Sequence, residues 1–198
     1  INKNVKVDYH TNTDITFSLK AINEYIESNG ITFDESLYNN WWSQINEWRD
    51  KNCLHYEQSD ETIKPQHAIS RLYQLTNQKD TFVTTAVGQH QMWAAQYYKF
   101  AKPNRWITSG GLGTMGVGMP AAIGAHMADP NSLVIDIAGE ASFLMNVQEI
   151  ATAVQYKLPI KIFILNNEYM GMVRQWQELM HGSRYSESYV DALQILKN

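Results

Sequence analysis

Between residues 65 and 165 the chain alternates short, β-rich apolar segments with segments of helical periodicity, and this alternation restricts the fold more than any other feature. We expect strands over the segments 81–87, 105–108, 132–138 and 160–165. A helix over 65–75, with Pro65 in its first turn, precedes them. Strands that are buried on both faces and alternate with helices form a parallel, doubly wound sheet. The pattern therefore predicts an α/β fold whose ligands bind beyond the carboxyl ends of the strands.

The last two predicted strands are joined by a segment whose apolar residues fall on one helical face, namely Val147, Ile150, Ala151 and Val154. Asn146 is in position to cap this helix, and Glu149 stands three residues later, as in a capping box. Pro120 is expected to interrupt the preceding helix soon after that helix begins.

The first sixty residues follow a different pattern. A short strand is expected over 6–9, and a helix over 15–28 between the start signal Asp14 and the stop signal Asn29-Gly30. A second helix over 34–51 carries three tryptophans, for which packing in a core or an interface is a better explanation than a ligand platform.

A polar stretch at residues 58–64 ends at Pro65 and indicates a domain boundary. We therefore divide the chain into residues 1–60, a partial second domain, and residues 61–198, the α/β domain. Because the chain opens with Ile1, we expect it to be cut from a longer protein.

Composition excludes several classes of function. A net charge of −4 gives no basic stripe for a phosphate backbone, so we expect no nucleic-acid partner. The longest apolar run, at residues 160–165, is far shorter than the ~20 residues that span a membrane. The single cysteine, Cys53, indicates a reducing compartment. With no signal peptide in view, we expect a cytoplasmic protein without a membrane partner.

Small and polar residues follow each predicted strand, at residues 88–91, 109–116, 139–142 and 166–171. In a parallel sheet these segments converge at one edge, where glycine backbone N–H groups and helix N-termini favour an anion. The sequence therefore predicts a phosphate site at this edge.

The second of these segments contains Gly111, Gly113 and Gly116 in the G-x-G-x-x-G spacing of a dinucleotide fingerprint. Small residues that let a helix pack closely on the sheet explain the same glycines. An NAD site therefore stays open here as an alternative.

A carboxylate and a carboxamide end the last two strands. Glu140 follows Gly139, and Asn167 follows 27 residues later, counted from 140 to 167. With a helix between them the two strands are neighbours, so their oxygens meet at one edge, as a Mg²⁺–diphosphate pair requires. The alternative is that Asn166 and Asn167 merely close a turn.

Three stretches carry a specific resemblance: VGQHQMWAAQ, SGGLGTMGVGMPAAIGA and, over residues 139–177, GEASFLMNVQEIATAVQYKLPIKIFILNNEYMGMVRQWQ. They resemble the bacterial catalytic subunits of the acetohydroxyacid synthase (acetolactate synthase) family of thiamine-diphosphate (ThDP) enzymes. The resemblance is close over residues 65–189, and MVRQWQ points to this member rather than to a pyruvate oxidase or decarboxylase. Residues 1–60 resemble the tail of the family's central FAD-binding domain with its linker.

The resemblance implies a role for individual residues. The metal ligands fall on Glu140, Asn167 and the backbone carbonyl of Tyr169. The remaining cofactor contacts fall on Gln89, His90, Ala141 and Ser142 at the diphosphate, on Gly113 and Met115 at the aminopyrimidine, and on Met172. Met172 and Trp176 line the substrate entrance.

It also implies ThDP, Mg²⁺ and FAD as cofactors, a homodimer, and a small regulatory subunit. The reaction would be decarboxylation of pyruvate and condensation with pyruvate or 2-oxobutyrate, in branched-chain amino-acid synthesis. The alternatives are a sibling ThDP-dependent oxidase or decarboxylase, and a truncated, non-catalytic nucleotide-binding module.

Two departures from the family matter. Glu140 replaces the family's Asp, and its added methylene moves the carboxylate by about 1.5 Å, so we expect weaker metal binding. The glutamate that activates the cofactor lies on a domain that no part of this chain resembles. We therefore assign no catalytic acid or base, interpret His126 and Glu149 as structural or solvated, and expect the segment alone to be inactive. The family's closing strand and C-terminal arm are also expected to be missing after Tyr189.

Overall fold

The computed structural model describes residues 3–191. The chain forms two units, the first of which ends at His55 and the second of which begins at Tyr56. The expected truncation, at residues 191–198, falls outside the described residues except for Asp191.

The first unit is built of helices: α1 (Ile15–Ser28), the 3₁₀-helix η1 (Glu35–Tyr38) and α2 (Asn39–Asp50). The carboxylate of Asp14 caps α1 by accepting a hydrogen bond from the backbone N–H of Thr16 at 2.9 Å. The sequence predicts the bounds of α1 correctly, but the single helix predicted over 34–51 is divided. Asp34 caps the 3₁₀ turn through the N–H of Ser36, and the α-helix starts only at Asn39.

The strand predicted at residues 6–9 is wrong, because the described residues of this unit are helical or irregular and offer no strand for it to pair with. Trp41 and Trp48 do pack together, edge to face with ring centroids 5.5 Å apart. Both remain about half exposed, at 53% and 46%, so the described part of this unit does not bury them.

The second unit contains the predicted sheet. Its strands are β1 (Thr81–Thr85), β2 (Trp106–Thr108), β3 (Leu133–Gly139) and β4 (Lys161–Leu165). They are parallel throughout and lie in the order β2-β1-β3-β4. The predicted α/β fold with a parallel sheet is therefore confirmed.

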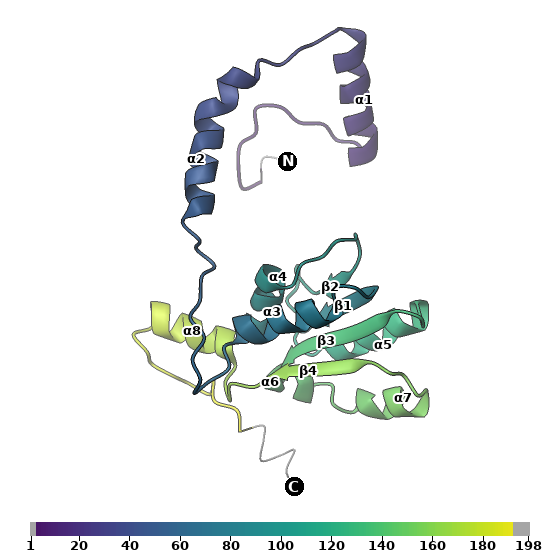
Figure 1. Ribbon diagram of the computed structural model, residues 1–198, viewed down its shortest axis with the longest axis vertical. Coiled ribbons are helices and arrows are strands. Elements are labelled where there is room, and N and C mark those ends of the chain that lie inside the picture. Colours follow the sequence, from purple (N-terminus) through teal and green to yellow (C-terminus); the bar gives the residue numbers. More distant parts are fainter. Residues whose placement is uncertain (1–2, 192–198) are drawn as a thin grey trace. The chain divides into compact units, whose positions relative to one another are not determined.

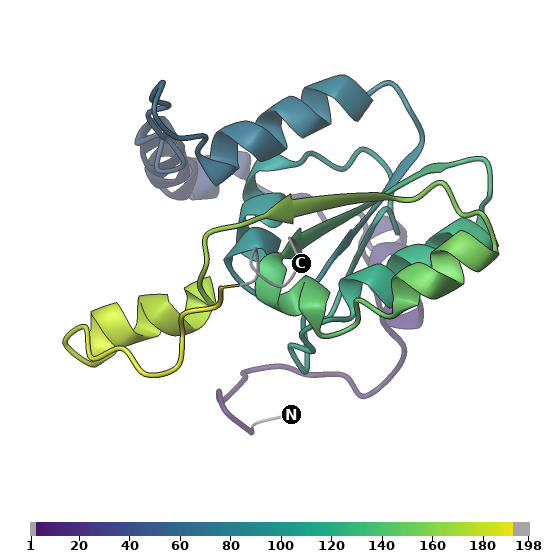
Figure 2. The ribbon, with the colours of Figure 1, turned by 90° about the horizontal axis from the view of Figure 1, so that it is seen from below.

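Helices cover both faces of this sheet (Figure 1 and Figure 2). They are α3 (Pro65–Thr76), α4 (Gln89–Tyr97), α5 (Gly118–Ala128), α6 (Glu140–Leu144) and α7 (Glu149–Gln155), whereas α8 (Gly171–Met180) follows β4 and extends away from the sheet (Figure 2). Because successive strand residues point to opposite faces, β3 serves two cores. Val134 packs with Ala122 and Ala125 of α5, whereas Ile135 and Ile137 pack with residues of α3 and α4.

Two helix-end predictions are wrong. Pro120 does not interrupt α5, because it lies in the first turn, where its missing N–H would have had no helical partner. Asn146 does not cap α7: the residue before that helix is Gln148, and the Asn146 amide donates instead to the carbonyl of Gly116 at 2.9 Å. Glu149 accepts a hydrogen bond from Thr152 Oγ1 at 3.0 Å rather than completing a capping box.

The parallel register fixes where the loops lie. Thr85 pairs with Thr108 and with Ile137, and Gly139 pairs with Leu165, so the strands end at one edge of the sheet. The segments that follow all four strands are therefore brought together there. Among the helices of the described part, none is long and apolar enough to cross a bilayer.

A buried carboxyl lies inside the sheet beneath this edge. Asp136 of β3 is 1% exposed, and its Oδ1 accepts a hydrogen bond from Thr84 Oγ1 at 3.2 Å. Burial raises the pKa of Asp136 from its ordinary 3.8 to about 7, although the bond from Thr84 lowers it.

The folded protein therefore holds a proton on Asp136 between about pH 4 and pH 7 that the unfolded chain has lost, so the free energy of unfolding falls as the pH rises through this window. We expect Asp136→Asn to raise the melting temperature relative to wild type by several degrees more at pH 8 than at pH 4, since each kcal/mol corresponds to about 2–4 °C in a protein of this size. Differential scanning calorimetry across this range measures it. The exposed Asp60→Asn is the control, and a pH-independent difference for Asp136→Asn would contradict the expectation.

Candidate functional site

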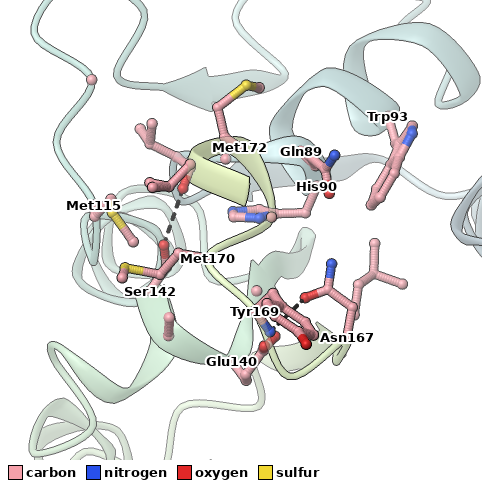
Figure 3. Close-up of a pocket in the computed structure, with 18 residues that line it drawn as sticks. Gln89, His90, Trp93, Met115, Glu140, Ser142, Asn167, Tyr169, Met170 and Met172 are labelled. Carbon is pink, nitrogen blue, oxygen red and sulfur yellow. Dashed lines mark hydrogen bonds between the residues drawn. The ribbon is translucent and has the colours of Figure 1, made fainter. Parts of the chain in front are cut away.

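A cavity of about 180 Å³ opens where the strand-end segments meet. Its walls come from the loop after β1 with the start of α4, the loop before α5, the β3–α6 junction, and the β4–α8 connection (Figure 3). The residues predicted for cofactor and metal all line it, namely Gln89, His90, Gly113, Met115, Glu140, Ala141, Ser142, Asn167, Tyr169 and Met172. Trp176 does not line it and is 51% exposed on α8.

Glu140 is the buried acid of this cavity. It is the first residue of α6 and only 3% exposed, and its Oε1 has no hydrogen-bond partner among the described residues. Burial raises the pKa of Glu140, while the backbone N–H groups of residues 167–169 lower it. A buried carboxylate oxygen without a partner is costly, and a cation is the group that satisfies it best.

Asn166 and Asn167 close the turn after β4. Asn166 Oδ1 accepts from the N–H of Glu168 at 3.4 Å, and Asn167 Oδ1 accepts from the N–H of Tyr169 at 3.1 Å. Glu168 has the left-handed φ of 61° that such a turn uses. The turn alternative is therefore correct in its geometry. A carboxamide oxygen has a second lone pair, however, so Asn167 keeps the capacity to bind a metal.

Tyr169 is held by pairing with a segment twenty residues away. The N–H of Met170 donates to the carbonyl of Ser188, and the N–H of Val190 donates to the carbonyl of Glu168, both at 2.8 Å, on either side of the Tyr169–Tyr189 bridge. In an antiparallel pair, the backbone N–H and C=O groups of one residue point toward the partner strand, and those of the next residue point away from it. The Tyr169 N–H and carbonyl thus point away from residues 188–190, on the side where its N–H meets Asn167.

The Tyr169 ring is fixed as well. The Arg174 guanidinium lies over it, 4.1 Å from its centroid, and pairs with Glu178 at 2.9 Å. Figure 3 shows Tyr169 beside Glu140 and Asn167 at one end of the cavity. The three groups predicted to hold a metal are thus brought together.

His90 forms the second polar wall. It is 6% exposed, and burial lowers the pKa of His90 to about 4 despite a hydrogen bond to the backbone of Ala86. The imidazole is therefore neutral at pH 7, and its Nε2 has no partner among the described residues. Gly88 and Gly139 make room for the ring, because a Cβ on either would lie 3.0 Å from it.

The loop before α5 provides the remaining wall, through Gly113 and Met115. Gly113 has a φ of +66°, which glycine adopts without strain. Of the G-x-G-x-x-G glycines only Gly113 is among the cavity-lining residues, and a Cβ on Gly111 would meet open space. The other two glycines of the fingerprint, Gly111 and Gly116, thus lie outside the described walls of this cavity.

Sequence reasoning did not nominate the lining residues Trp93, Leu165 and Val173, whereas Met170 and Gly171 fall within the predicted segment 166–171. Trp93 stands four and three residues after Gln89 and His90, and this helical spacing could have placed it on the same face of α4. No comparable signal marks Leu165 or Val173.

Comparison with known proteins decides the family. Residues 86–197 match the family described as thiamine pyrophosphate enzyme, C-terminal TPP binding domain, which is more than half of the chain. The chain belongs to this family.

Curated relatives of this thiamine pyrophosphate domain are acetolactate synthases. The chain is 53% identical to the acetolactate synthase isozyme 3 large subunit of Escherichia coli K12 over 153 residues, which are 77% of this chain and 26% of that protein. It is 48% identical to the acetolactate synthase large subunit of Buchnera aphidicola subsp. Schlechtendalia chinensis over 175 residues, 88% of this chain and 30% of that protein. The chain is 43% identical to the chloroplastic acetolactate synthase 2 of Brassica napus over 190 residues, which are 96% of this chain and 29% of that protein. The chain thus spans between a quarter and a third of these relatives.

Gly171 of the thiamine pyrophosphate domain stands where two elements of the site nearly touch. A Cβ there would overlap Gln89 Oε1 and lie 3.0 Å from Asn167 Nδ2. We expect Gly171→Ala to push both amides aside and to weaken ThDP–Mg²⁺ binding by at least about tenfold, equivalent to ~1.4 kcal/mol. Gly124→Ala in α5 is the matched control, because a Cβ there meets nothing within 4 Å. Isothermal titration calorimetry on the full-length protein measures both. Equal affinity for the two variants would contradict the role of Gly171.

Proposed function

We propose that this chain is the cofactor-binding part of an acetolactate synthase large subunit. The observation that carries the proposal is that one cavity of a thiamine pyrophosphate domain is lined by two residues, Glu140 and His90, whose buried Oε1 and Nε2 atoms have no partner among the described residues. Identities of 43–53% to acetolactate synthases support the assignment of the reaction.

The residues present fit a Mg²⁺–diphosphate group. Glu140, Asn167 and the Tyr169 carbonyl would hold the ion, since they offer the three hard oxygens that Mg²⁺ prefers. Gln89, His90, Ala141 and Ser142 would contact the diphosphate, while Gly113, Met115 and Met172 would contact the rest of the cofactor. When bound, ThDP supplies the nucleophilic carbon and the electron sink for decarboxylation of a 2-oxo acid.

The chain's own side chains act by positioning and by excluding water. Ser142 Oγ donates to the carbonyl of Val87 at 3.1 Å and so fixes the loop that leads to His90. Leu165, Met170 and Val173 make much of the remaining wall apolar, which strengthens each polar contact inside. None of the residues that line the cavity is assigned as the base that activates the cofactor, and we propose that this group comes from another domain.

The substrates, on this proposal, are pyruvate and a second 2-oxo acid, pyruvate or 2-oxobutyrate, with Met172 and Trp176 at their entrance. Trp176 is exposed on α8, five residues from the cavity-lining Gly171, and is available to a substrate that approaches from solvent. Residues 1–60 would be the tail of an FAD-binding domain. The complete enzyme would be a cytoplasmic homodimer with a small regulatory subunit.

Binding and turnover of the full-length protein test the proposal. We expect saturable binding of ThDP that requires Mg²⁺, no binding of NAD, and formation of acetolactate from pyruvate. Binding without acetolactate, but with acetaldehyde or acetyl phosphate, would identify a sibling decarboxylase or oxidase instead. Binding of NAD in preference to ThDP would overturn the assignment altogether.

The length of the acid at position 140 gives a sharper prediction. Glu140 reaches about 1.5 Å further than an aspartate, and a misplacement near 1 Å can reduce a rate ~10²-fold. We expect Glu140→Asp to bind Mg²⁺ about tenfold more tightly in the presence of ThDP, measured by Mg²⁺ titration of the full-length protein. Glu149→Asp, at the start of α7 outside the cavity, is the control. Equal Mg²⁺ affinities for wild type and Glu140→Asp would refute the prediction.

A further inference from the structure

Asn146 is a polar side chain near the cavity that the proposed function does not use. It lies between α6 and α7, is half-buried and does not line the cavity. Its Oδ1 accepts a hydrogen bond from Gln148 Nε2 at 3.2 Å, and its Nδ2 donates to the carbonyl of Gly116 at 2.9 Å. The two bonds fix which end of the amide faces Gly116.

The partner of Asn146 is tightly fitted. Gly116 is buried and has a φ of +85°, and a Cβ on it would lie 2.8 Å from Asn146 Nδ2 and 3.1 Å from Met145 Cβ. Only glycine allows this approach. The close fit indicates that the contact between Asn146 and Gly116 sets the position of the loop rather than merely accompanying it.

The loop that Gly116 ends is otherwise weakly held. Residues 110–114 are exposed, and Leu112 is 94% exposed. Apart from the Asn146 bond, two side-chain hydrogen bonds hold the described loop, both at Ser109: Ser109 Oγ accepts from the N–H of Thr114 at 3.1 Å, and the Ser109 carbonyl accepts from Gln91 Nε2 at 3.4 Å. Met115 lines the cavity and directly precedes Gly116, so the hydrogen bond from Asn146 holds the backbone one residue away from a cavity wall.

The same short segment also holds the opposite wall. Glu140, the buried acid, is the first residue of α6, and Ser142 of that helix bonds to Val87 beside the His90 wall. Residues 140–146 therefore run from Glu140, which lines the cavity beside Asn167 and Tyr169 (Figure 3), past Ser142 to Asn146, whose amide bonds to Gly116 next to the cavity-lining Met115.

We propose that Asn146 is a positioning residue that sets the distance between the diphosphate end and the aminopyrimidine end of the site. It acts through the Gly116 carbonyl on Gly113 and Met115. The inference rests on the proposed function, because it takes these two residues as the aminopyrimidine contacts. A ligand that spans both ends should therefore depend on Asn146, whereas a ligand that fills only the diphosphate end should not.

The test compares two ligands on one variant of the full-length protein. Asn146→Asp keeps the shape of the side chain but replaces the donor that faces Gly116 with an acceptor. We expect ThDP–Mg²⁺ affinity to fall at least tenfold and pyrophosphate–Mg²⁺ affinity to change less than twofold, both by isothermal titration calorimetry. Gln148→Ala, which removes only the neighbouring contact, is the matched control and should change ThDP affinity less than threefold. Asn146→Ser replaces Asn146→Asp if the latter lowers the melting temperature enough to unfold the protein.

The outcomes separate the two proposals. Failure of wild type to bind ThDP would overturn the proposed function. If wild type binds ThDP, then an unchanged ThDP affinity in Asn146→Asp, or an equal loss of ThDP and pyrophosphate affinity, would overturn the role of Asn146 and leave the proposed function standing.

Discussion

The parallel pairing of β1, β3 and β4 is the constraint on which the site depends. Parallel strands all end at one edge of the sheet, and here that edge receives Val87 to His90, Gly139 to Ser142 and Asn167 to Gly171 from widely separated parts of the chain. The packing of Ile135 and Ile137 on one face and Val134 on the other keeps β3 in the middle of the sheet. Glu140 is buried because it directly follows this central strand, and its Oε1 lacks a hydrogen-bond partner among the described residues.

Most of the architecture of the second unit was predictable from the sequence. Apolar segments such as 132–138 and 160–165 carry a strong strand signal: β3 is shifted from the first by one residue at each end, and β4 begins one residue later than the second. The site residues were found because strand ends in a parallel sheet must meet and because the family resemblance named the individual positions. Residues such as Leu165 and Val173, whose side chains carry no chemistry of their own, gave no such signal.

Two of the three errors share a physical cause. Asn146 has the right spacing for a cap, but its amide donates to the carbonyl of Gly116, a partner thirty residues earlier in the chain. Pro120 was expected to break a helix whose first turn in fact begins only at Gly118. Residues 6–9 have the composition of a strand, yet a strand needs a neighbour to pair with. For Asn146 and for residues 6–9, a contact distant in sequence, or its absence among the described residues, decided between two locally acceptable conformations. The Pro120 error concerned instead the residue at which the helix begins.

The antiparallel bridge between Tyr169 and Tyr189 has a consequence for the evolution and engineering of this domain. The direction of the Tyr169 carbonyl is imposed by backbone bonds to Ser188 and Val190, so it is independent of which side chain occupies position 169. If this carbonyl is the metal ligand that we propose, substitution at position 169 is tolerable, whereas an insertion or deletion that shifts residues 188–190 by one position would turn the carbonyl to the other side. The side chain at position 169 can therefore change during evolution, whereas the length of the loop between residues 169 and 189 cannot.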